Sequence, residues 1–110
     1  MNINLEQTIL RNLLTNEEYT RRVLPFLAPD YFEGVYKDLF KEVAKFVSKY
    51  NKIPTLESFK IEVDEGNRLS EENYRQAIEM LPNIFTAESE NLDWLVERTE
   101  KWCQDRSVYN

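Results

Sequence analysis

The segment from Val35 to Tyr50 constrains the fold more than any other part of the chain. Apolar side chains recur there at three- and four-residue intervals, which gives one wide apolar face to an α-helix. A face of this width has to be buried, so we expect a helix over residues 35–50 at the centre of the core. The opposite side carries a ridge of lysines at four-residue spacing: Lys37, Lys41, Lys45 and Lys49.

This lysine ridge has two interpretations. It could face an anion, or it could be the solvated side of an amphipathic helix that mixes in the charges of Asp38 and Glu42. The second interpretation is favoured, because the chain is acidic overall, with a formal charge of −6. No aromatic residue is expected to be interleaved with the lysines.

Two helices are expected before this segment. The apolar stripe from Leu5 to Leu14 predicts a first helix over about residues 3–14. Thr15 is placed to cap a second helix, with Glu18 three residues later completing a capping box. Pro25 argues against the unbroken continuation of that second helix.

Three helices are expected after it. Thr55 and Ser70 are suitable N-caps for a fourth and a fifth helix. Pro82 is expected to end the fifth helix, because the residue before a proline avoids the helical region. Residues 82–90 then form a loop, and the sixth helix runs from Asn91 onward.

The composition fits one all-α domain over residues 1–110. Only two glycines and four prolines are present, and no stretch alternates between apolar and polar residues for long enough to predict a strand. With 42% hydrophobic residues, the chain can bury a core without a disulfide or a metal. The predicted fold is a compact bundle of about six helices.

Several kinds of chemistry are excluded by what the sequence lacks. It has no histidine, and its single cysteine, Cys103, is interpreted as a structural thiol. Neither a G-x-x-x-x-G-K-[ST] loop nor a G-x-G-x-x-G motif is present. We therefore predict no catalytic, cofactor-binding or metal-binding residue, and the acidity argues against strong intrinsic DNA binding.

The acidic residues between Glu62 and Glu72 leave one enzymatic alternative. Carboxylates that converge can hold a divalent cation, so this cluster could be the centre of a metal-dependent enzyme. A solvated acidic surface is favoured, because Glu71 and Glu72 fall in a first helical turn, where the helix dipole stabilises negative charge.

Large aromatic residues are the candidates for contact with a partner. Trp94 and Trp102 lie eight residues apart on the last helix, and we place both on about the same face. Trp94 is expected in the core. For Trp102, a place in the core and a contact with a partner are about equally favoured. The candidate partner contacts are therefore Trp102, Tyr109 and Tyr50.

The helical pattern at the end of the chain continues to Asn110 without a glycine, a proline or a cap. We therefore expect the chain to be a fragment of a larger molecule in which this helix continues. A free-standing small acidic adaptor or inhibitor protein, which binds a replication factor, is the alternative.

Five short segments carry a resemblance to a known family by their order and spacing. They are Leu5–Leu10, Pro29–Phe32, Tyr36–Phe40, Ile53–Leu56 and Gln104–Val108. Together they resemble the N-terminal domain of DnaB-type replicative helicases, especially those encoded by phages. The resemblance covers nearly the whole chain and implies the all-α head of such a helicase.

The resemblance also implies a function. Such a head forms part of the collar of a hexameric ring that encircles single-stranded DNA, where it helps to assemble the ring and engages primase or a helicase loader. A helical hairpin and a RecA-like ATPase domain would follow Asn110, and ATP and Mg²⁺ would bind there, so this chain would have no catalytic role or cofactor. Single-stranded DNA would be contacted only through the full-length protein. The expected location is the cytoplasm, that of the bacterial host if the protein is phage-encoded, with no membrane association.

Overall fold

The computed structural model describes residues 5–66, 69–86 and 90–109, and within these residues every regular element is helical. The elements are α1 (Leu5–Thr15), α2 (Glu17–Val23), the 3₁₀ turns η1 (Leu24–Phe26) and η2 (Pro29–Tyr31), α3 (Val35–Tyr50), α4 (Leu56–Gly66), α5 (Glu71–Thr86) and α6 (Leu92–Tyr109). The prediction of an all-α bundle of about six helices is confirmed.

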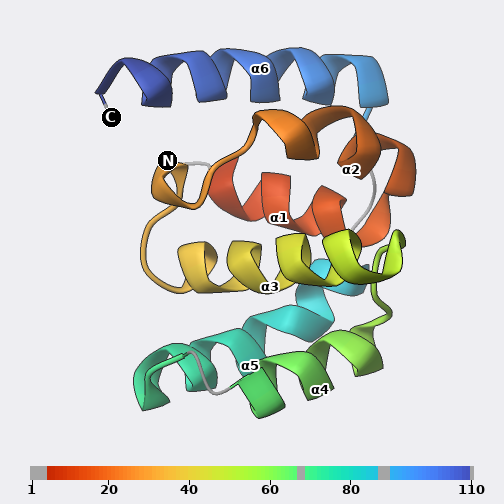
Figure 1. The fold of residues 1–110 in the computed structure, drawn as a ribbon, viewed down its shortest axis with the longest axis vertical. Coiled ribbons are helices and arrows are strands. Elements are labelled where there is room, and N and C mark those ends of the chain that lie inside the picture. The colour runs from red at the N-terminus through yellow and green to blue at the C-terminus, as the bar shows by residue number, and fades with distance from the viewer. Residues whose placement is uncertain (1–4, 67–68, 87–89, 110) are drawn as a thin grey trace.

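The helices are arranged in layers (Figure 1). Helices α1 and α3 form the middle and contact each other, while α4 and α5 pack together on one side of them. On the other side, α2 packs on α1, and α6 lies across α2 and the η2 turn as the outermost layer. The last helix is therefore separated from α4 by the whole thickness of the domain.

Helices α1 and α3 form the centre of the core. Four apolar residues of α1 are almost completely inaccessible: Ile9, Leu10, Leu13 and Leu14. The α3 helix has the bounds predicted from its apolar pattern and buries Leu39, Phe40 and Val43 against them. The predicted position of this helix at the centre of the core is therefore confirmed.

A row of aromatic rings connects α3 with α6. The Phe40 ring stacks on Phe32 with a centroid separation of 4.8 Å, and Phe32 in turn lies 5.0 Å from Trp102. The Trp102 ring also meets Tyr31 edge-on at 6.0 Å. These contacts fix the chain between η2 and α3, since aromatic pairs at such separations add to the stability gained by burial.

Both ends of α3 use a left-handed φ angle. Gly34 precedes the helix with φ 57° and ψ −133°, a conformation that costs glycine little because it has no Cβ. Asn51 follows the helix with φ 56°, and its backbone N–H donates to the carbonyl of Val47 at 2.8 Å. The helix boundaries are therefore fixed by local backbone chemistry as well as by packing.

The predicted caps of the other helices are partly confirmed. The hydroxyls of Thr55 and Ser70 accept hydrogen bonds from backbone N–H groups three residues later, as expected for N-caps. The prediction for Thr15 is wrong. Asn16 caps α2, with its side-chain oxygen accepting from the N–H of Tyr19, while the Thr15 hydroxyl donates to the Arg11 carbonyl within α1.

The predicted end of the fifth helix is also wrong. Pro82 lies inside α5, which continues to Thr86, so residues 82–86 are helical and not part of a loop. Residues 87–89 lie outside the described part of the chain. Burial of Ala77, Leu81 and Ile84 explains the continuation, because one packed face extends across the proline. Tertiary packing thus outweighs the hydrogen bond that Pro82 cannot donate.

The α6 helix is joined to α2 by a buried pair of hydroxyl groups. The Oη atom of Tyr19 lies 2.7 Å from Oγ1 of Thr99, and both residues are at most 1% exposed. Burial raises the pKa of Tyr19, so its phenol remains protonated in the fold. Asn91 caps this helix, accepting from the Trp94 N–H at 3.0 Å, so the helix itself begins at Leu92.

Candidate functional site

The acidic residues near the junction of α4 and α5 do not converge on one point. Among the residues that the structure describes, no three His, Cys, Asp or Glu side chains come close enough to hold a metal ion. The carboxylate of Asp64 accepts a hydrogen bond from the Tyr74 hydroxyl at 2.9 Å, which raises the pKa of Tyr74. Glu71 and Glu72 are exposed in the first turn of α5. This geometry favours the solvated surface over the metal centre.

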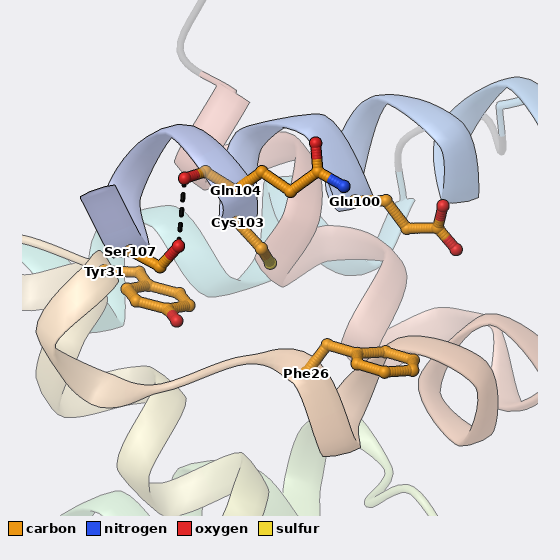
Figure 2. A pocket seen from close by; sticks show the side chains of 6 residues that line it. All are labelled: Phe26, Tyr31, Glu100, Cys103, Gln104 and Ser107. Atoms are coloured by element: carbon orange, nitrogen blue, oxygen red, sulfur yellow. Dashed lines mark hydrogen bonds between the residues drawn. The ribbon is translucent and has the colours of Figure 1, made fainter. Parts of the chain in front are cut away.

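A groove lies between α6 and the two 3₁₀ turns. It has a volume of about 250 Å³, and Figure 2 shows the six side chains that line it. They are Phe26, Tyr31, Glu100, Cys103, Gln104 and Ser107. Phe26 stands at its edge with 62% of its surface exposed, the largest exposed fraction among the large hydrophobic residues described.

No sequence pattern predicted a role for Phe26. It lies in the η1 turn directly after Pro25, outside any helix whose periodicity could have assigned it to a face. The only sequence feature that could have indicated its exposure is its position between two prolines, in a segment too short to bury the ring. Such a position predicts exposure only when the neighbouring packing is known.

Cys103 lies on the α6 side of this groove, with its sulfur directed between Tyr31 and Phe26 (Figure 2). The residue is 7% exposed, and burial, with a smaller contribution from the charge of Glu100, raises the pKa of its thiol to about 11. A nucleophilic cysteine needs the opposite shift, because the thiolate is the reactive form. The structure therefore supports the prediction of a structural thiol.

The two tryptophans of α6 have different environments. Trp94 is 47% exposed, so the prediction that it lies in the core is wrong. Trp102 is 8% exposed, packs against Tyr31 and Phe32, and has the Arg106 guanidinium 5.1 Å from its ring centroid. It therefore offers little surface to a partner, and its predicted partner contact stays a prediction.

The other two candidate partner contacts are Tyr50 and Tyr109. Tyr50 is 49% exposed at the end of α3. Tyr109 is the last residue of α6, and its side chain lies outside the described part of the structure. An aromatic side chain does contact the end of the lysine ridge, since the Lys49 ammonium lies 5.3 Å from the centroid of the Tyr50 ring, just beyond the last lysine.

The described residues thus form a small all-α domain of an acidic chain. The chain is similar to a DnaB-like replicative helicase of Enterobacteria phage T4, with 29% identity over 105 residues. This similarity covers 94% of the chain but only 22% of the relative, so the chain spans about a fifth of the relative's length. The match fits the N-terminal domain of a DnaB-type helicase and agrees with the resemblance of the five segments.

No protein-family model matches the chain. Within the described part of the structure, no helix has the length and apolar character that crossing a membrane requires.

Proposed function

We propose that this chain is the N-terminal domain of a phage-type replicative DNA helicase and serves as its scaffold and docking module. The observation that carries the proposal is the similarity to the phage T4 helicase, which runs through 94% of the chain. An all-α bundle with a separate outer helix is compatible with such a role, because a scaffold needs stable surfaces and no chemistry of its own.

The proposal assigns motor functions elsewhere. ATP and Mg²⁺ would bind to another domain of the full-length protein, and single-stranded DNA would be gripped there as well. This domain would contribute to the assembly of the helicase ring and would present surfaces to primase or to a loader. Its net charge of −6 fits contacts with proteins better than continuous contact with phosphates.

A chimera tests the proposal. The matching 105-residue stretch of the phage T4 helicase is replaced by this chain, and the oligomer is measured by mass photometry with and without ATP. We expect the chimera to form the same oligomer as the intact T4 protein and to retain unwinding of a forked DNA. The control is a deletion of the same stretch.

Two results would contradict the proposal. A chimera that behaves like the deletion variant would show that this chain cannot replace the T4 segment, which favours the free-standing adaptor or inhibitor instead. ATP hydrolysis by the isolated chain, measured by phosphate release, would contradict the assignment of catalysis to another domain. We expect no hydrolysis, because the sequence has no phosphate-binding loop.

A further inference from the structure

One surface of this acidic domain is basic and carries exposed aromatic area. We use the name lysine stripe for Lys41, Lys45 and Lys49, which are all exposed and follow each other every fourth residue on α3. Because an α-helix rises 1.5 Å per residue, the backbone positions of neighbouring lysines in the stripe are about 6 Å apart along the helix axis. Lys37, at the other end of the ridge, differs because it pairs with Asp30 at 3.1 Å.

The lysine stripe is not neutralised within the described part of the chain. None of its three ammonium groups lies within 4.0 Å of a described carboxylate, although the chain has 20 acidic residues. Two glutamates, Glu62 and the buried Glu42, line a small depression together with Lys45 and Lys49.

Two aromatic rings border the same depression. Tyr50 and Phe46 lie with their centroids 4.7 Å apart, and the Lys49 ammonium lies 5.3 Å from the Tyr50 centroid. Tyr50 is half exposed, and the depression between α3 and α4 holds about 50 Å³, which is room for a small apolar side chain only. The surface thus combines a row of cations with one apolar contact point at the end of the row, where Glu42 and Glu62 also lie.

We propose that the lysine stripe and Tyr50 bind an acidic amphipathic helix of a partner protein. A helix with carboxylates every four residues repeats every 6 Å or so, and its row turns by about 40° around the axis at each step, as the stripe does. The two oblique rows can therefore face each other where the helices cross, and an apolar side chain on the flank of the partner helix would meet Tyr50 and Phe46. This inference adds the chemistry of one partner to the proposed docking role, and it rests on that role only for the idea that a partner exists.

Nucleic acid fits this surface less well. The stripe extends for about 12 Å, over the eight residues from Lys41 to Lys49, so a phosphate backbone would run past it onto the acidic remainder of the domain. A short acidic helix ends with the stripe, so the carboxylates it meets are those of Glu42 and Glu62 in the depression and not those of the remaining surface. At physiological salt the Debye length is about 8 Å, so only carboxylates within about that distance of the bound molecule repel it strongly.

The test is a titration of this chain, followed by fluorescence anisotropy and by NMR shifts of its backbone amides. The probe is a fluorescein-labelled, alanine-based peptide of about 16 residues, with glutamate at every fourth position and a flanking leucine. A peptide of the same composition, with its glutamates distributed around the helix, is compared with it. An oligothymidylate of about 15 nucleotides is the third probe.

We expect the patterned peptide to bind most tightly and to shift the amides of α3 near Lys45 and Tyr50. The double substitution Lys45→Glu and Lys49→Glu should weaken binding by about tenfold or more. The matched control, Arg98→Glu with Lys101→Glu on the exposed side of α6, changes the net charge equally and should alter binding by less than about twofold. Tyr50→Ala should weaken binding without changing the melting temperature, since its ring is half exposed.

Three results would overturn the inference. They are an absence of peptide binding up to about 1 mM, equal binding of the two peptides, and tighter binding of the oligonucleotide that is lost in the same variant. The last result would identify a nucleic-acid surface instead. Circular dichroism confirms that each variant is folded, and the titration is independent of the T4 chimera, so the two proposals can fail separately.

Discussion

At the scale of single residues, the two tryptophans of α6 show why spacing alone misplaces a side chain. A separation of eight residues corresponds to about 800° of helix rotation, which leaves Trp102 about 80° away from Trp94 around the axis. Trp102 consequently meets Tyr31 and Phe32, while Trp94 projects toward solvent with 47% of its surface exposed.

Substitution of each tryptophan by alanine should separate these environments. Trp102→Ala should reduce the free energy of unfolding by about 3–5 kcal/mol, because it removes a large buried ring from the aromatic row. Trp94→Ala should change it by about 0.5 kcal/mol or less. Urea denaturation monitored by far-ultraviolet circular dichroism measures both, and equal effects of the two substitutions would mean that α6 does not bury Trp102 in preference to Trp94.

Phe40 is the most direct test of the core. It is 2% exposed and stacks on Phe32, so Phe40→Ala should reduce the free energy of unfolding by about 3–5 kcal/mol. Phe26→Ala is the control, because its ring is mostly exposed and should cost little. An unchanged denaturation midpoint for the Phe40 variant would show that α3 faces another way.

At the scale of elements, α5 shows the limit of a rule that depends on neighbouring residues only. A proline lacks the N–H that an interior helical position donates, and this property is visible in the sequence. The burial of Leu81 and Ile84 on either side of Pro82 depends on α1 and α3, which are far away in the chain. The helix continues because its packed face extends beyond the proline.

Pro82→Ala should therefore stabilise the domain. Pro82 is exposed, and alanine restores the missing N–H and the better helical propensity, which we expect to raise the free energy of unfolding by about 1–3 kcal/mol. Thermal denaturation measures the change. A lower melting temperature would indicate that the proline ring itself contributes to packing.

Much of the fold was predictable because its signals are local. The apolar face of α3 gives its bounds without error, and the hydroxyls of Thr55 and Ser70 are caps at the predicted positions. The cap of α2 was misassigned because two cap-forming residues, Thr15 and Asn16, are adjacent, and only the path of the chain decides between them. The aromatic contact of Lys49 depends on the rotamer of Tyr50, which no pattern predicts.

At the scale of the whole molecule, the described residues form one core whose stability should depend on pH in the alkaline range. Burial raises the pKa of Cys103 from 9.0 to about 11 and also raises that of Tyr19 above 10.0. Both groups therefore hold their protons more tightly in the folded state than in the unfolded state. Their contribution is complete below about pH 9 and is lost as the pH rises through the folded values.

The variant Cys103→Ser tests this dependence. Between pH 9 and about 11 the free energy of unfolding of the unmodified chain should fall more steeply than that of the variant, because serine does not titrate there. Urea denaturation at intervals of pH measures both slopes. Parallel curves would show that the thiol is more accessible to water than its burial indicates.

The seam between α2 and α6 has a mechanical consequence. The last helix rests on α2 and on the short turn at residues 29–31, and the oxygens of Tyr19 and Thr99 face each other where water does not reach. Separating α6 from α2 would leave both hydroxyl groups without a hydrogen-bond partner before water could replace the lost hydrogen bond. A force applied to the far end of α6 would therefore be transmitted to α2, and α6 would move as a rigid unit rather than detach turn by turn.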